Sequence, residues 1–163
     1  MTSQSPTHAA LATAAAPASP YFAPEHELLR DQVRRFVEAE IKPHAAAWET
    51  AGFVPRAVLK RMGALGFFGI RYPAAYGGSE MDTLATVVLA EELGRSTYAG
   101  VAVTVLVHTD MASVHVFSAG SQAQRARWMP GIIDGSVITA VAITEPDAGS
   151  DVKGMRPPPR RPG

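Results

Sequence analysis

The stretch from Pro24 to Ile41 reads PEHELLRDQVRRFVEAEI, and it decides the fold class expected for this chain. Its apolar residues recur at intervals of three and four positions, the spacing that gathers side chains on one face of an α-helix. These residues are Leu29, Val33, Phe36, Val37 and Ile41. Pro24 suits the first helical position, and Pro43 is expected to end the helix. The stretch therefore predicts an amphipathic helix that must bury one face against other elements.

Four further segments predict helices joined by short connections. They cover residues 55–65, 82–93, 101–119 and 121–129. In the second of them, Leu84, Val87, Val88 and Leu93 are expected to face a core. Several amphipathic helices in sequence predict a mainly α fold, with a helical bundle over residues 21–135.

Local signals fix the expected ends of these helices. Gly66 can close one helix in the left-handed conformation, and Asp82 can cap the start of the next. Ser121 and Gln124 match a capping box for the last helix. Pro130, followed by a glycine, is expected to stop that helix near residue 129.

The pattern changes after the helices. Residues 137–144 read VITAVAIT, a β-branched run with alternating character that predicts a strand leading into the polar loop of residues 145–151. We expect residues 136–155 to begin a β-domain. The prolines of the closing RPPPRRPG, residues 156–163, cannot continue an interior strand because they lack amide hydrogens.

Composition excludes several classes of function. Fifteen basic and fifteen acidic residues among 163 leave no net charge that would favour nucleic acid. The absence of cysteine excludes disulfides and cysteine-ligated metal sites, and it fits a cytoplasmic protein. Residues 1–20 are predicted to be a disordered tail without the features of a targeting peptide. The apolar stretch of residues 101–117 contains His108 and Asp110, so it is expected to be a buried helix rather than a membrane span.

The histidines and the aspartate of this stretch suggest a metal site, but their arrangement argues against one. His108, Asp110 and His115 are unevenly spaced on an apolar helix and have no clear further ligand. No metal site is therefore predicted, and structural or partly exposed roles are expected for all three. Glu91 and Glu92 are adjacent and so point to different faces of a helix, which disfavours paired acid and base catalysis.

One long motif carries a family resemblance. Residues 142–152, AITEPDAGSDV, preceded by WMPG at residues 128–131, closely resemble the N-terminal signature of acyl-CoA dehydrogenases. Weaker matches lie upstream in family order: FVEAEIKPHAAAWE from residue 36, MGALGFFGI from residue 62, YGG from residue 76 and AEELGRS from residue 90. The resemblance implies an N-terminal helical domain, a middle β-domain, a C-terminal helical domain, and FAD between the last two.

The resemblance also implies which residues contact the cofactor. They are Val141, Ala142, Ile143, Thr144, Gly149 and Ser150, and Ser150 is implied to touch the acyl-CoA substrate as well. The chemistry is reasonable, because Thr144 and Ser150 offer hydroxyls and Gly149 lets the backbone approach a ligand. Without the resemblance, the same residues could form only a polar turn after an edge strand.

The remaining machinery is implied to lie elsewhere. The resemblance puts the catalytic glutamate in the C-terminal domain, so no catalytic residue is predicted here and the chain is expected to be an N-terminal fragment, inactive alone. The family's partners would be an acyl-CoA, an electron-transfer flavoprotein and three further copies in a homo-tetramer. A non-catalytic helical remnant, a related flavin monooxygenase and an acyl-CoA oxidase remain alternatives.

Overall fold

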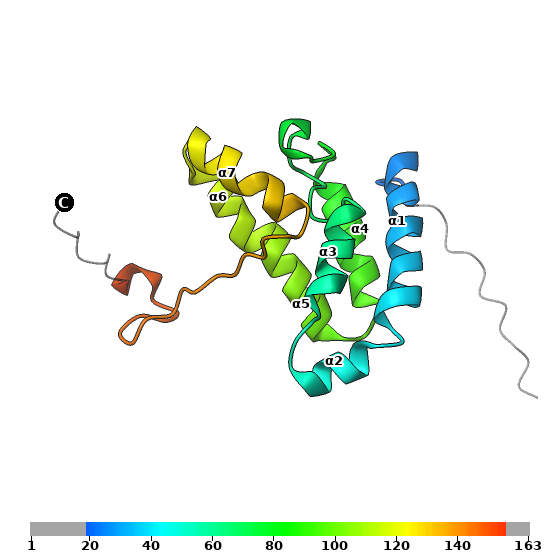
Figure 1. The fold of residues 1–163 in the computed structure, drawn as a ribbon, viewed down its shortest axis with the longest axis horizontal. Coiled ribbons are helices and arrows are strands. Elements are labelled where there is room, and N and C mark those ends of the chain that lie inside the picture. The colour runs from blue at the N-terminus through cyan, green and yellow to red at the C-terminus, as the bar shows by residue number, and fades with distance from the viewer. Residues whose placement is uncertain (1–18, 156–163) are drawn as a thin grey trace, which may run out of the picture.

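The computed structural model describes residues 19–155, and in this range the chain forms a bundle of helices (Figure 1). The expectations for residues 1–18 and 156–163 lie outside the described residues. The α-helices are α1 (Pro24–Phe36), α2 (Ala45–Ala51), α3 (Arg56–Ala64), α4 (Thr83–Gly94), α5 (Ala99–Leu106), α6 (Ser113–Ala119) and α7 (Gln122–Ile133). Two π-helical segments, Val37–Ile41 and Val107–Ala112, extend α1 and join α5 to α6. Short 3-10 turns occupy Ala74–Tyr76 and Val152–Gly154.

The helix ends confirm the local signals in the sequence. Pro24 occupies the first position of α1, and the Asp82 carboxylate accepts a hydrogen bond from the amide of Ala85 at 3.1 Å. Ser121 and Gln124 form the capping box, with the Ser121 amide donating to the Gln124 side chain at 2.8 Å. Gly66 follows α3 with a φ of +84°, the left-handed region that favours glycine.

The prediction that Pro130 ends the last helix is wrong. Helix α7 continues through Pro130 to Ile133. An interior proline costs a helix about 3 kcal/mol. Met129, Ile132 and Ile133 are all buried, and each such side chain contributes roughly 1.5–3 kcal/mol, which offsets that cost.

The core lies where α1 packs against α4, and it extends to α3 and α5. Val33, Met62, Val88 and Val105 are fully enclosed at its centre. Figure 1 shows α1 and α4 side by side at one end of the molecule. Val88 and Leu93 are buried as expected and Leu84 is half-buried, but Val87 is 39% exposed because it turns to the outer side of α4.

A buried carboxylate joins α1 to α4. The side chain of Glu92 is 1% exposed, and it accepts hydrogen bonds from Arg34 at 2.8 and 3.0 Å and from Arg30 at 3.3 Å. Burial alone would raise the pKa of Glu92, but hydrogen bonds from Arg34 and Arg30 and the charges of Arg34 and Arg95 lower it below its ordinary value. Glu92 is therefore an anion that holds two helices together. Its neighbour Glu91 lies on the surface and pairs with Arg30 at 2.6 Å.

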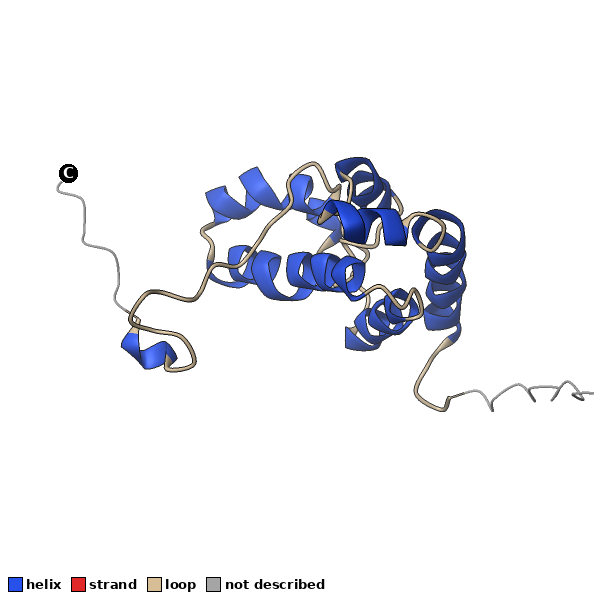
Figure 2. Ribbon diagram, turned by 90° about the horizontal axis from the view of Figure 1, so that it is seen from below, coloured by secondary structure: helices blue, strands red, loops and turns tan. Residues whose placement is uncertain are grey.

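The strand predicted over residues 137–144 is not formed. After Gly135, which has a φ of +75°, the chain stays in contact with the helices as far as Thr139 and then runs away from them, with no strand among residues 136–155 (Figure 2). A strand requires a neighbour to pair with its amides and carbonyls. Within residues 19–155 the only such pairing is an isolated antiparallel bridge between Glu145 and Ala148.

The continuous helical stretch Ala99–Ala119 is long and apolar enough to cross a membrane by length and composition. This is weak evidence for a span, since core helices of soluble proteins pass the same test, although such helices are mostly buried and 33% of this stretch is buried. Val101, Val105, His108 and Ser113 of this stretch are buried inside the bundle.

We predict that Glu92→Gln lowers the free energy of unfolding by about 2 kcal/mol, because it removes the buried negative charge with which Arg30, Arg34 and Arg95 all pair. The matched control is Glu38→Gln, which removes an exposed pair with Lys42 and should change stability by less than about 0.5 kcal/mol. Urea unfolding at neutral pH measures both. Equal losses in the two variants would show that the buried carboxylate does not join the helices.

The contribution of Glu92 to the free energy of unfolding should also decrease as the pH falls. Because the folded state lowers its pKa, the stabilisation is complete above the ordinary carboxyl pKa and is lost as pH falls through the lowered value. The stability difference between the parent chain and Glu92→Gln should therefore shrink in acid. A difference that stays constant down to the acid transition would contradict this.

Candidate functional site

The residues expected to contact a cofactor all lie on the segment that leaves the helical bundle. Val141 is half-buried, whereas Ala142, Ile143 and Thr144 are exposed. Gly149 and Ser150 come on the far side of a turn and are also exposed. In Figure 2 this segment is the irregular chain that extends beyond the last helix towards the C-terminal end. These residues are thus neighbours along one segment, and among residues 19–155 no other element packs opposite them.

The turn within this segment is built from its own backbone. The Glu145 amide donates to the Ala148 carbonyl at 2.8 Å, and the Ala148 amide donates back at 3.2 Å. Ala148 is 4% exposed, since the 3-10 turn at Val152–Gly154 folds back beside it. These local contacts hold Thr144 before the turn and Ser150 after it, and they leave both residues exposed to solvent.

Glycine at position 149 has a different setting from the packed glycines. A Cβ added at Gly78 would lie 1.9 Å from the Tyr72 carbonyl oxygen, so the chain's own packing excludes a side chain there. A Cβ added at Gly149 would meet nothing within 4 Å. The backbone at Gly149 is therefore open to close approach by a ligand, which is the property expected of it from the sequence.

The side chains of the three residues that could have suggested a metal site do not point to a common position. His108 is buried and bonds to the Ile132 carbonyl, Asp110 pairs with Arg71 at 2.9 Å, and His115 is exposed. Over residues 19–155 no group of three or more histidine, aspartate or glutamate side chains is arranged to hold a metal ion. His108 and Asp110 instead connect neighbouring elements of the fold.

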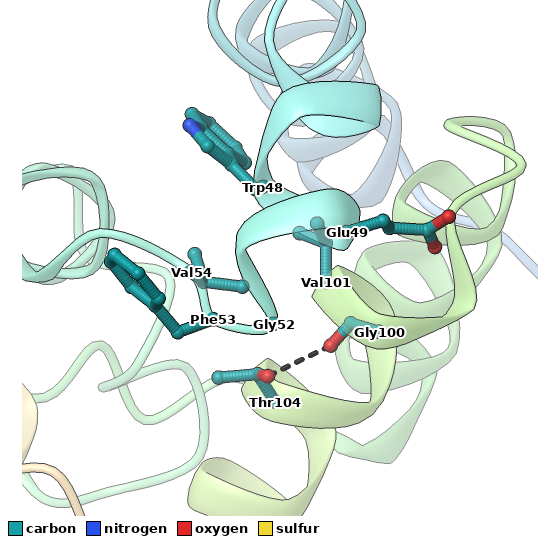
Figure 3. A pocket seen from close by; sticks show the side chains of 8 residues that line it. All are labelled: Trp48, Glu49, Gly52, Phe53, Val54, Gly100, Val101 and Thr104. Atoms are coloured by element: carbon teal, nitrogen blue, oxygen red, sulfur yellow. Dashed lines mark hydrogen bonds between the residues drawn. The ribbon is translucent and has the colours of Figure 1, made fainter.

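One pocket was not predicted from the sequence. It has a volume of about 420 Å³ and lies between α2 with the loop after it and the start of α5. Figure 3 shows Trp48, Phe53 and Val54 on one side and Val101 and Thr104 on the other. No local pattern predicts it, because its walls lie about fifty residues apart in the chain.

The side chains that line this pocket are mainly apolar. The Thr104 hydroxyl donates to the carbonyl of Gly100 at 2.7 Å, so it is already used within α5 (Figure 3). Glu49 adds one exposed carboxylate at the edge. None of the residues expected to contact FAD lines it, and it is therefore separate from the candidate cofactor segment.

Known proteins are similar to this chain in sequence and in fold. The sequence model of the family "Acyl-CoA dehydrogenase, N-terminal domain" matches residues 23–136. The mouse long-chain specific mitochondrial acyl-CoA dehydrogenase is 36% identical over 142 residues, which cover 87% of this chain and 33% of that protein.

Two solved structures extend the comparison. An acyl-CoA dehydrogenase from Geobacillus kaustophilus superposes with a TM-score of 0.76 at 34% identity, over 84% of this chain and 36% of that one. One from Bacillus anthracis, complexed with FAD, gives a TM-score of 0.78 at 29% identity, over 83% of this chain and 23% of that one. The chain thus spans about a third or less of the length of these relatives.

The match of the family model covers α1 to α7, and the superpositions reproduce the helical arrangement. On these grounds the chain belongs to the acyl-CoA dehydrogenase family and corresponds to its N-terminal helical domain.

Proposed function

We propose that this chain supplies the N-terminal helical domain of an FAD-dependent acyl-CoA dehydrogenase that introduces an α,β double bond into acyl-CoA thioesters. One observation carries the proposal: the family match runs across the helical bundle to residue 136, and an exposed segment with the family's signature comes directly after it. The proposal concerns the activity of an assembled enzyme, since the chain spans only about a third of its mouse relative.

The donor set of the segment fits a flavin cofactor. Thr144 and Ser150 are exposed and offer hydroxyls, and Gly149 has an open backbone. Hydroxyls and unhindered amides suit the polar ring edge and pyrophosphate of FAD. When bound, FAD supplies the hydride acceptor for the β-carbon of the substrate. The role of this chain's residues is then to bind and orient the cofactor, with Val141, Ala142 and Ile143 beside it and Ser150 also in reach of the acyl-CoA.

The acyl chain of the substrate requires apolar surface. Helix α5 and the π-helical segment after it expose Val103 and Met111, at 56% and 48%. Such surface suits an acyl chain or the helices of a further domain. The proton abstraction that accompanies hydride transfer needs a base, which we place outside this chain. An electron-transfer flavoprotein as acceptor, a homo-tetrameric assembly and a cytoplasmic location complete the proposal.

A non-catalytic role is the second candidate. It is favoured by the fact that all predicted cofactor contacts lie on one exposed segment with no facing wall among the described residues. In that case the helical bundle would act only by associating with other chains. On the same scaffold, an acyl-CoA oxidase would differ from the main proposal in passing the electrons to O2, and a flavin monooxygenase would differ in inserting an oxygen atom from O2 into its substrate.

We predict that the purified 163-residue chain is colourless and does not oxidise acyl-CoA with an artificial electron acceptor. A single exposed segment buries too little of a cofactor for tight binding, and positioned proton abstraction is missing. Absorbance spectra and a dye-reduction assay, with a mock preparation as control, measure both. Stoichiometric bound flavin, or turnover that tracks the chain through purification, would contradict this.

A chimera tests whether this chain can support FAD binding and activity when the other domains are supplied. Residues 23–150 of this chain would replace the corresponding part of the Geobacillus kaustophilus enzyme, which is 34% identical. We expect the chimera to retain FAD and to oxidise acyl-CoA. Ser150→Ala should weaken FAD binding about tenfold, the effect of one lost hydrogen bond worth about 1.4 kcal/mol.

The control for this variant is Ser118→Ala, which removes an exposed serine on α6 that bonds only to its own helix at the Val114 carbonyl. A folded chimera that takes up no flavin, or equal FAD affinity in the Ser150 and Ser118 variants, would overturn the assignment.

A further inference from the structure

The π-helical segment between α5 and α6 places a buried histidine beside the root of the cofactor segment. His108 is 1% exposed, and its ring meets Phe68 edge to face at 4.7 Å between ring centres. A π-helical turn widens the helix locally and is frequently found at functional sites. Here it lets the carbonyl of His108 accept from the amide and the hydroxyl of Ser113 while the ring points away towards α7.

Both ring nitrogens of His108 are used. Nε2 faces the carbonyl oxygen of Ile132 at 3.0 Å, and a carbonyl oxygen can only accept, so Nε2 carries the proton. Nδ1 accepts from the backbone amide of Thr139 at 3.1 Å and lies 2.8 Å from the Thr139 hydroxyl. The same hydroxyl is within 3.2 Å of the His108 carbonyl. The ring thus bridges the end of α7 and the chain after it, in a single tautomer.

The neutral form of this ring is the one that can make the bridge. Burial lowers the pKa of His108, and the hydrogen bond to Ile132 opposes this only in part. A neutral ring keeps the Nδ1 lone pair available for the Thr139 amide. Protonation of Nδ1 would place two donors, the ring N–H and the Thr139 amide, against each other.

Thr139 is the point at which the segment leaves the helical body. Val137 still donates to the Gly131 carbonyl at 2.9 Å, and Ile138 packs against the main core. Two residues beyond Thr139, the predicted cofactor contacts begin at Val141. We propose that His108 is a positioning residue that anchors Thr139 through Nδ1 and thereby fixes the origin and direction of the segment that holds the flavin. The effect on the flavin rests on the proposed function, whereas the anchoring does not.

Two variants of His108 separate its two hydrogen bonds. In His108→Asn the amide oxygen lies where Nδ1 was and can accept from Thr139, while the bond to Ile132 is lost. In His108→Gln the amide nitrogen reaches the Nε2 position and keeps the Ile132 bond, while the Thr139 bond is lost. Both variants lose one buried hydrogen bond, so a merely structural role predicts similar behaviour for the two.

The readout is a nitroxide label at Ala140→Cys in the full 163-residue chain. Position 140 is exposed, and the chain has no cysteine, so the label is unique. We expect a slow spectral component in the parent chain and in His108→Asn. The slow component should be lost in His108→Gln at equal helical content by circular dichroism. Thr139→Ala leaves the buried His108 ring unchanged and should lose part of the slow component. This variant keeps the test valid if a His108 variant does not fold.

The result that overturns the proposal is equal mobility of the label in the parent chain, in His108→Gln and in Thr139→Ala. In the chimera, the loss of the anchor further predicts that His108→Gln binds FAD more weakly than His108→Asn does. If the label responds as expected but no chimera takes up FAD, the anchor stands and the proposed function fails.

Discussion

The rest of the structure depends on the packing of α1 against α4, which Glu92 completes from within. Its carboxylate lies between Arg34 and Arg30, and the helix pair encloses Val33 and Val88. Since a buried charge is tolerated only with its partners in place, this contact fixes one relative position of the two helices. Helices α3 and α5 then complete the core around that pair.

A second cluster extends this body towards the C-terminal end of the bundle. Met129, Ile132 and Ile133 of α7 pack with Tyr72, whose hydroxyl contacts Ser113 at 2.7 Å. His108 and Thr139 lie at the boundary of this cluster, and beyond them the chain has little regular structure up to residue 155. Within residues 19–155 the molecule therefore combines a self-supporting helical body with a segment that has exposed polar side chains and little packing around them.

The sequence predicted the features that depend on neighbouring residues. Proline at the start of α1, Asp82 as a cap and the Ser121 capping box are short-range signals, and each is present in the structure. Features that depend on distant residues were missed. Glu92 bonds to two arginines that lie 58 and 62 positions away from it in the sequence. The hydrogen bond between His108 and Thr139 joins residues that are 31 positions apart. The end of α7 was misplaced because burial of Ile132 and Ile133 outweighs the local effect of Pro130.

The candidate cofactor residues were predicted from the family resemblance alone. Taken one at a time, Thr144, Gly149 and Ser150 are ordinary residues of a polar turn, and the structure indeed shows a turn beside them. The predicted strand failed for a physical reason, since strand formation is a property of a pair and residues 19–155 supply no partner. The boundary between the helical domain and the segment after it, placed at residue 135, stays a prediction.

The central claim is that the helical body is self-supporting and that support ends at Thr139. Residue-resolved hydrogen exchange on the intact chain tests it most directly, because exchange reports the free energy of opening at each amide. We predict that amides in α1, α4 and α7 exchange only through global unfolding. The Thr139 amide should be protected, and amides of residues 140–144 should exchange as in an unstructured peptide. Protection of residues 140–144 equal to that of the helices, or helices that exchange freely, would contradict the account.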